Sequence, residues 1–231
     1  MKKTSSIQAF SERIGIRFKD LSLLEQALTH SSYVNETKEP VADNERLEFL
    51  GDAVLELAMT TYLFTKYPEA EEGELSKLRA QYVCEQALVY YAQSIGLNHY
   101  LRLGKGEEAS GGRERPAILA DAFEAMLGAI YLDQGFSVAY DFLKRVVFTP
   151  IDNGFRVEFK DYKSQLQELV QADSNRSIHY KMVHEEGPAH HRIFTVEVYM
   201  DNILMGVGKG HSKKEAEQQA AKEALEKVAR G

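Results

Sequence analysis

The sequence has few of the features that mark secreted or membrane proteins. It contains 231 residues and one cysteine, Cys84, so no intrachain disulfide can form, and a reducing compartment such as the cytoplasm is the simplest location. Its polar start, MKKTSS, lacks the apolar core of a signal peptide. No apolar run approaches the roughly 18 residues that a membrane-spanning helix needs. We therefore expect a cytoplasmic globular protein with no membrane association.

The charge is unevenly distributed along the chain. The net charge of −7 disfavours nucleic acid as a partner on average. Residues 160–231, however, hold 11 basic and 11 acidic residues, so the whole excess of acid lies in residues 1–159. A nucleic-acid site needs a local basic patch rather than a basic average. The two parts of the chain are therefore expected to perform different tasks.

The first part has the composition and apolar spacing of an all-α domain. Ala, Leu, Glu and Gln dominate stretches with apolar residues at helical intervals. These stretches predict helices at residues 7–14, 21–30, 44–67, 73–95, 116–132 and 136–147. Residues 104–115 are rich in glycine and charge and are expected to form a flexible loop.

The second part has a different pattern, which predicts a small α+β domain. Residues 161–171 have helical periodicity, and residues 178–184, 193–200 and 203–207 have the alternating, β-branched pattern of strands. An alanine-rich helix follows at 213–228, with Ser212 and Glu215 in the positions of a capping box. The order is α-β-β-β-α. We expect domains at 1–150 and 160–231, joined by a linker at 151–159 that contains Asn153-Gly154.

A row of acidic residues follows one face of the helix expected at 44–67. At about 100° per residue, Glu45, Glu48 and Asp52 fall within about 60° of one another. Carboxylates in one row repel, and helix stability favours a lysine or arginine among them. The opposite face should be the buried one. It carries Leu47, Leu50, Ala53, Val54 and Leu57.

A second acidic pair, Asp121 and Glu124, stands at i, i+3 in the helix expected at 116–132. Small apolar residues surround the pair, and carboxylates in such a setting are costly unless a positive group pairs with them. A divalent cation could do so. No histidine or cysteine accompanies either acidic group, so an all-oxygen ligand set would suit Mg²⁺, or Mn²⁺ as a substitute, rather than Zn²⁺.

Spacing alone leaves a second interpretation open for both acidic groups. Charged residues on a helix usually form a solvated surface. The sequence also gives no evidence that the two helices meet. A metal site at this point is therefore a hypothesis that competes with an ordinary acidic surface.

The second part holds two segments that suit contact with phosphates. The first is the turn between the first two expected strands, GPAHH at 187–191. The second joins the last strand to the last helix, where Lys213 and Lys214 occupy the first helical turn. The helix dipole disfavours cations there, but lysines beside free backbone N–H groups make a good phosphate site. Solubilising surface lysines remain the alternative.

These motifs resemble a known family. Residues 44–52 (NERLEFLGD) resemble the signature of bacterial ribonuclease III. Three further segments resemble its other blocks in matching order: 27–33 (ALTHSSY), 72–76 (EGELS) and 120–125 (ADAFEA). Residues 160–230 resemble a double-stranded-RNA-binding domain. The resemblance covers nearly the whole chain, and two domain signatures in the expected order make it specific.

The resemblance implies roles for the acidic residues. Glu48, Asp52, Asp121 and Glu124 would be the metal-binding and catalytic carboxylates, with Asp52 and Glu124 most directly involved in the chemistry. Two further glutamates, Glu45 and Glu72, would support the site or contact RNA. The family acts as a homodimer in which Phe49 would enter a pocket on the partner.

The resemblance also implies a reaction and a mode of RNA binding. Mg²⁺-dependent hydrolysis would cut double-stranded RNA to 5′-phosphate and 3′-hydroxyl ends with short 3′ overhangs, and ribosomal RNA precursors would be among the substrates. The RNA-binding domain would read the A-form shape rather than the sequence. Its expected contacts are Ser164, Gln167 and Glu168 in one minor groove, Pro188 and His190 in the next, and Lys209, Lys213 and Lys214 on the phosphates between.

Two other functions compete with the nuclease. A dimer that binds double-stranded RNA without cutting it would need no carboxylate cluster, so the intact acidic set favours the enzyme. A metal-dependent enzyme that acts on another phosphodiester is disfavoured by the second domain. Among the remaining residues, His30 is expected to hold a helix end through hydrogen bonds rather than to act in catalysis.

Overall fold

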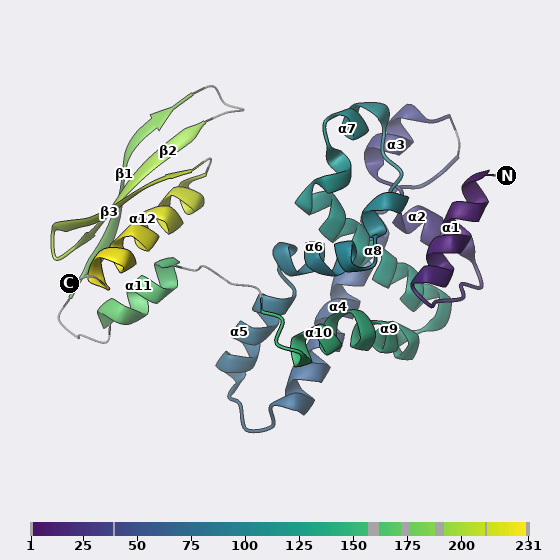
Figure 1. Ribbon diagram of the computed structural model, residues 1–231, viewed down its shortest axis with the longest axis horizontal. Helices are drawn as coiled ribbons and strands as arrows, with labels where there is room; N and C mark the ends of the chain where they lie inside the picture. The colour runs from purple at the N-terminus through teal and green to yellow at the C-terminus, as the bar shows by residue number, and fades with distance from the viewer. Residues whose placement is uncertain are drawn as a thin grey trace. The chain divides into compact units, whose positions relative to one another are not determined.

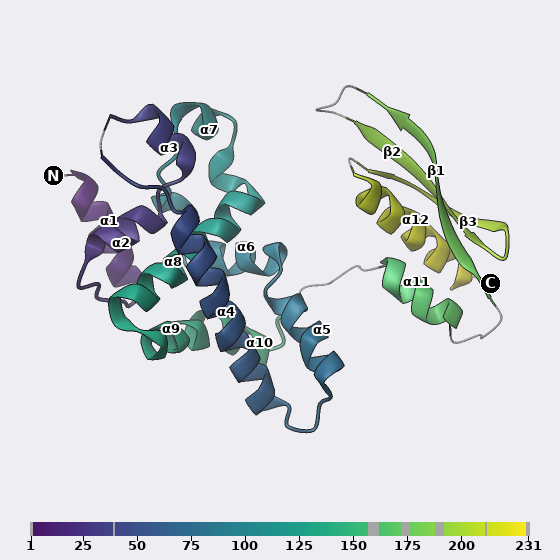
Figure 2. The same ribbon diagram turned by 180° about the vertical axis from the view of Figure 1, so that it is seen from behind.

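The computed structural model describes residues 2–38, 40–156, 162–171, 176–187, 192–210 and 212–229. The chain divides into two compact units, Met1–Val157 and Glu158–Gly231. Figures 1 and 2 show a helical first unit and a second unit in which helices pack on a sheet. Within the described ranges, no helix is long and apolar enough to cross a membrane.

The first unit is built from helices, as its composition predicts. Its α-helices are α1 (Lys2–Arg13), α2 (Leu21–Ala27), α3 (Ser31–Glu36), α4 (Glu45–Lys66), α5 (Glu72–Tyr82), α6 (Glu85–Ser94), α7 (Lys105–Ala109), α8 (Pro116–Gln134), α9 (Phe136–Leu143) and α10 (Thr149–Asp152). Short 3₁₀ segments, η1 (Leu97–Tyr100) and η2 (Gly112–Glu114), and a π-helical turn, η3 (Lys144–Phe148), complete it.

Helix α8 forms the centre of the core. Pro116 starts it at a position where a missing N–H costs nothing, and Gly135, with φ of 84°, ends it. Nearly every residue from Ile118 to Ile130 is buried, and α8 packs against α2, α4, α6 and α9. A helix that is apolar on all sides must be enclosed by others, so the only polar side chains in this stretch, Asp121 and Glu124, lie in an apolar setting.

Several segments of the first unit differ from the expectation. The helix expected at 21–30 ends at Ala27, and a separate helix, α3, begins at Ser31. The single helix expected at 73–95 is two helices, because the extended backbone of Cys84 (ψ 158°) separates α5 from α6. This bend allows both Tyr82 and Tyr91 to be fully buried. The flexible loop expected at 104–115 contains α7 and η2, and it is held by Arg113, which donates to the carbonyls of Asn98 and Leu101.

The end of the first unit is attached to its surface by side-chain contacts. Ile151 is buried, and Lys66 and Tyr62 of α4 both contact the carboxylate of Asp152. Phe155 stacks on Tyr90 with ring centroids 4.1 Å apart. The residues expected to begin the linker therefore pack on the helical unit as far as this ring.

The second unit has the expected α-β-β-β-α order. Helix α11 (Tyr162–Gln171) precedes an antiparallel sheet in the order β1-β2-β3, and α12 (Lys213–Val228) follows it. The strands are β1 (Ile178–Glu186), β2 (Ile193–Met200) and β3 (Ile203–Gly210). Asp201 and Asn202 form the β2–β3 turn with positive φ of 50° and 66°, as a tight hairpin requires.

Helix α12 packs directly on the backbone of β3. A Cβ atom at Gly208 would lie 2.0 Å from the carbonyl oxygen of Ala216, and one at Gly206 would lie 2.3 Å from that of Ala220. Glycine on the strand and alanine on the helix are therefore the residues that allow this contact. The capping prediction is confirmed, since the Ser212 hydroxyl accepts a hydrogen bond from the backbone N–H of Glu215 at 3.1 Å. Strand β3 continues three residues past its expected end, to Gly210.

Candidate active site

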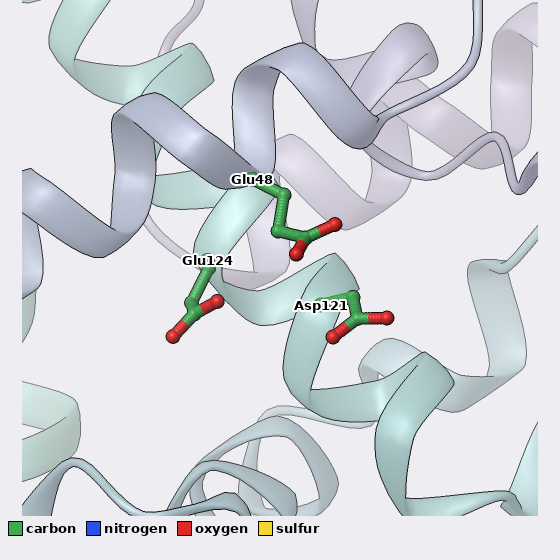
Figure 3. A group of neighbouring side chains, drawn as sticks. All are labelled: Glu48, Asp121 and Glu124. Carbon is green, nitrogen blue, oxygen red and sulfur yellow. The ribbon is translucent and has the colours of Figure 1, made fainter.

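Helices α4 and α8 bring carboxylates from distant parts of the sequence together. One ligand oxygen from each of Glu48, Asp121 and Glu124 lies within 4.8 Å of the others. Figure 3 shows the Glu48 side chain, on α4, above those of Asp121 and Glu124 on the neighbouring α8. The sequence placed these residues on two separate helices and could not establish that the helices meet.

The buried face of α4 differs from the expected one. Leu47 and Val54 are buried as expected, but Ala53 is exposed and the side chain of Leu57 is 56% exposed. Gly51 lies against α8 instead, and Leu55 is fully buried beside it. The face of α4 that packs on α8 is therefore closer to the acidic residues than expected, and Glu48 lies at the edge of that contact.

Asp52 lies beside the cluster rather than within it. It is exposed, and its oxygens are outside the group that shares the 4.8 Å limit. Its charge nevertheless contributes to the raised pKa of both Glu48 and Glu124. No hydrogen-bond or ion-pair partner of Asp52 is found among the described residues, so its carboxylate is available to solvent and ligands.

The cluster holds protons more tightly than ordinary carboxylates do. Burial, followed by the charges of Asp52, Glu48 and Asp121, raises the pKa of Glu124 to about 8. Burial and the charge of Asp121 also raise the pKa of Glu48. Desolvation and mutual repulsion both disfavour the charged forms. When ionised, the cluster carries negative charges that no positive side chain in the group balances, so a cation would stabilise the ionised state.

Two neighbours of Asp121 have opposite effects on it. Burial raises the pKa of the Asp121 carboxyl, the charge of Glu85 raises it further, and His30 lowers it. His30 is the N-cap of α3, with Nδ1 accepting from the backbone N–H of Ser32 at 3.2 Å, which confirms its expected structural role. The sequence missed Glu85, because the break that starts α6 was not expected.

Other predicted site residues of the first unit lie outside the cluster. Glu45 is exposed in the first turn of α4, close enough for its charge to raise the pKa of Glu48. Glu72 begins α5 and accepts a hydrogen bond from Ser76 at 2.8 Å, and it is not part of the carboxylate group. Phe49 is 82% exposed on α4.

The residues of the second unit that are predicted to contact RNA are exposed where they are described. Lys163, in the first turn of α11, contacts the second turn of α12 through an ion pair with Glu217 at 2.6 Å. Its backbone N–H also donates to the side-chain oxygen of Gln218 at 3.2 Å. The start of α11 therefore lies beside the second turn of α12, one turn after Lys213 and Lys214. The exposed residues are Ser164, Gln167, Glu168, Lys209, Lys213 and Lys214. Pro188 and His190 lie outside the described residues.

Comparisons with known proteins agree with both units. A family model described as ribonuclease-III-like matches residues 20–151, and one described as the double-stranded RNA binding motif matches residues 162–228. The chain is 56% identical over 228 residues to ribonuclease 3 of Bacillus cereus (strain G9842), covering 98% of this chain and 93% of the relative. Ribonuclease 3 of Bacillus anthracis (strain CDC 684 / NRRL 3495) matches at the same identity and coverage.

Solved structures give the same result for the first unit. The nuclease domain of ribonuclease III from Campylobacter jejuni, described for flexibility in a region involved in dimer formation, aligns with a TM-score of 0.58 and 43% identity. The alignment covers 62% of this chain and 96% of the Campylobacter jejuni chain. A second structure of that domain, at 2.2 Å resolution, aligns with a TM-score of 0.57 and 40% identity, covering 65% and 97%.

A helical domain with paired acidic helices and an α-β-β-β-α domain that binds double-stranded RNA together define a class of RNA-cleaving enzymes. The chain belongs to the ribonuclease III family, and it is an endoribonuclease that acts on double-stranded RNA.

Proposed function

We propose that the chain is a Mg²⁺-dependent enzyme that hydrolyses phosphodiester bonds in double-stranded RNA at the carboxylate cluster. The observation that carries the proposal is the convergence of Glu48, Asp121 and Glu124, whose oxygens lie within 4.8 Å of one another. Asp52 beside them completes the proposed set of metal-binding and catalytic groups. Products would carry 5′-phosphate and 3′-hydroxyl ends with short 3′ overhangs.

The donor set fits a hard divalent cation. All the converging atoms are carboxylate oxygens, with no histidine or cysteine in the group, and Mg²⁺ and Mn²⁺ prefer such ligands. Burial and repulsion raise the pKa of Glu124 to about 8, so cation binding at neutral pH must displace a proton from the cluster. When bound, the ion would activate water and stabilise the leaving oxygen.

The individual carboxylates are suited to different tasks. Glu124 and Asp121 are held on α8 by a fully packed core, which gives the site rigid ligands. Asp52 is exposed and without a described partner, so its oxygens can orient the attacking water and accept its proton. Glu45 and Glu72 would support the site or contact the RNA from positions outside the cluster.

The second unit would hold the duplex. Lys213 and Lys214 stand in the first turn of α12, where the helix dipole favours a phosphate group. Ser164, at the adjoining end of α11, would reach the sugar edges of the minor groove. We propose that the first unit carries catalysis and dimer formation, and that the second unit carries RNA affinity.

A homodimer is supported by the outer face of α4. Phe49, Leu57 and Phe64 are 82%, 56% and 72% exposed, and with Ala53 they lie within about 80° of one another on the helix. This face is opposite Gly51, which contacts α8. A row of exposed large apolar side chains marks an interaction surface, and a second copy would bury it. Sedimentation analysis of Phe64→Glu should show monomers if this face forms the dimer.

Maturation of ribosomal RNA precursors and other structured transcripts, in the cytoplasm, is the cellular role that we propose for this activity. The single cysteine, Cys84, is free, which suits a reducing compartment.

The test is a cleavage assay on a long perfect RNA duplex, with Mg²⁺ and with EDTA, for the wild type and for Glu124→Gln. We expect metal-dependent shortening to small duplexes that the substitution abolishes while RNA binding persists. Glu69→Gln, which alters an exposed glutamate outside the cluster, serves as the matched control. Duplex binding without cleavage by the wild type, in both Mg²⁺ and Mn²⁺, would leave a non-cleaving RNA-binding dimer as the function.

A further inference from the structure

Two glycines stand where α4 crosses α8, and each faces the backbone of the other helix. A Cβ atom at Gly51 would lie 1.7 Å from the carbonyl oxygen of Glu124 and 2.9 Å from the nitrogen of Gly128. One at Gly128 would lie 2.3 Å from the carbonyl oxygen of Leu47. Both glycines are buried within helices. The two helices therefore touch backbone to backbone at this point.

The backbone contact joins the same residues that carry the carboxylates. Gly51 immediately precedes Asp52 and lies three residues after Glu48. The atom that it meets belongs to Glu124 itself. Gly128 lies one turn beyond Glu124 on α8. Any change in the separation of the helices at this crossing therefore changes the distance between Glu48 and the two α8 carboxylates directly.

Alanine cannot replace either glycine without separating the helices. Real Cβ contacts are essentially never shorter than 3.0 Å, so the backbones would have to move apart by about 1.3 Å for Gly51→Ala and about 0.7 Å for Gly128→Ala. Both obstructing atoms are backbone oxygens, which have no rotamer to adopt. Glycine also has a lower helix propensity than alanine, so neither residue is favoured here by local helix stability.

Mg²⁺ is more sensitive than Ca²⁺ to the spacing of its ligand oxygens. Oxygens on opposite sides of Mg²⁺ are about 4.2 Å apart, and those around Ca²⁺ are about 4.6–5.2 Å apart, from their usual bond lengths. One oxygen of each cluster carboxylate lies within 4.8 Å of the others, an upper limit that a cation of either size can satisfy. A further separation of about 1 Å would exceed what Mg²⁺ tolerates. Ca²⁺ accepts longer bonds and irregular geometry, so it should be affected less.

We propose that Gly51 and Gly128 are positioning residues, which set the spacing between the α4 and α8 carboxylates and so select a small divalent cation. This inference rests on the proposed function, because it requires that the cluster binds the metal. The glycines act through Glu48, Asp121 and Glu124 and contact neither the cation nor the RNA.

The experiment measures Mg²⁺ and Ca²⁺ affinities by titration calorimetry on the full chain, without RNA, for the wild type, Gly51→Ala and Gly128→Ala. Circular dichroism and sedimentation verify that each variant is folded. Gly73→Ala is the matched control, because a Cβ there meets nothing within 4 Å. Leu63→Ala is the control for lost stability. It removes a buried side chain of α4 about 18 Å along the helix from Gly51.

We expect Gly51→Ala and Gly128→Ala to weaken Mg²⁺ binding at least tenfold and Ca²⁺ binding less than threefold, while both controls behave as the wild type. Unchanged Mg²⁺ affinity in a folded variant overturns the proposal. So does an equal loss for both cations, or a change that Leu63→Ala reproduces. If neither glycine variant folds, the glycines serve packing alone and the proposal is wrong. A wild type that binds neither cation refutes the metal site itself.

Discussion

The raised pKa of Glu124 predicts how the stability of the metal-free protein depends on pH. Burial and the neighbouring carboxylates raise this pKa from 4.5 to about 8. A carboxyl group with a folded-state pKa above its unfolded value stabilises the fold while it is protonated. That contribution is complete below about pH 4.5 and is lost as the pH rises to 8. The metal-free wild type should therefore become less stable across this range.

Glu124→Gln removes this dependence, because the amide imitates the neutral carboxyl. One pKa unit corresponds to about 1.4 kcal/mol, so the full shift sets an upper limit of roughly 5 kcal/mol. Partial access of solvent to the site and mutual adjustment of the other carboxylates should reduce the effect to about 2 kcal/mol. At pH 8 in EDTA, the variant should be more stable than the wild type by this amount. At pH 5 the two should be nearly equal.

Urea denaturation followed by circular dichroism, at half-unit steps from pH 5 to 8.5, measures the difference. Glu69→Gln, at an exposed site, controls for the loss of one negative charge. Saturating Mg²⁺ at pH 8 should stabilise the wild type more than Glu124→Gln, since the cation takes the place of the lost proton. A difference between variant and wild type that is the same at pH 5 and pH 8 would refute the assignment of the raised pKa to Glu124.

Three further predictions concern other sites. Asp121→Asn should weaken Mg²⁺ binding at least tenfold in calorimetry while leaving duplex affinity in Ca²⁺ unchanged in gel-shift assays. Lys213→Ala and Lys214→Ala should each lower the slope of log affinity against log salt by about 1 in fluorescence anisotropy with labelled duplex RNA. Asp152→Asn should destabilise the protein by less than about 1 kcal/mol at pH 7. The hydrogen bond from Lys66 lowers the pKa of Asp152, so this difference should shrink in urea unfolding as the pH falls below 3.8.

Helix ends and strand order were predictable where single residues determine them. Pro68 cannot continue a helix, and α4 ends just before it, at Lys66. Ser212 caps α12 through its hydroxyl, as the spacing to Glu215 indicates. The alternating pattern of residues 193–200 is sufficient to locate β2. In each case the physical cause is local, so the sequence alone contains it.

The break between α5 and α6 was not predictable in this way. No glycine or proline marks Val83-Cys84, and both neighbouring segments have helical composition. The bend follows from the burial of both Tyr82 and Tyr91. The Tyr91 hydroxyl donates a hydrogen bond to the backbone carbonyl of Tyr82 at 3.4 Å. The start of α6, and with it the position of Glu85 near Asp121, therefore depends on tertiary packing.

The orientation of α4 explains why Glu48 and Asp52, which lie on the same face of the helix, differ in burial. Counting apolar residues assigned Leu57 to the core, because large side chains usually determine the buried face. In the structure a side chain is absent at the closest contact, where Gly51 meets α8. This contact turns Glu48 toward Asp121 and Glu124 and leaves Asp52 exposed. It also directs Phe49, Leu57 and Phe64 outward, on the face that the proposed dimer would cover. The same helix rotation thus accounts for a half-buried carboxylate cluster and an exposed apolar face on opposite sides of α4, the longest helix among the described residues.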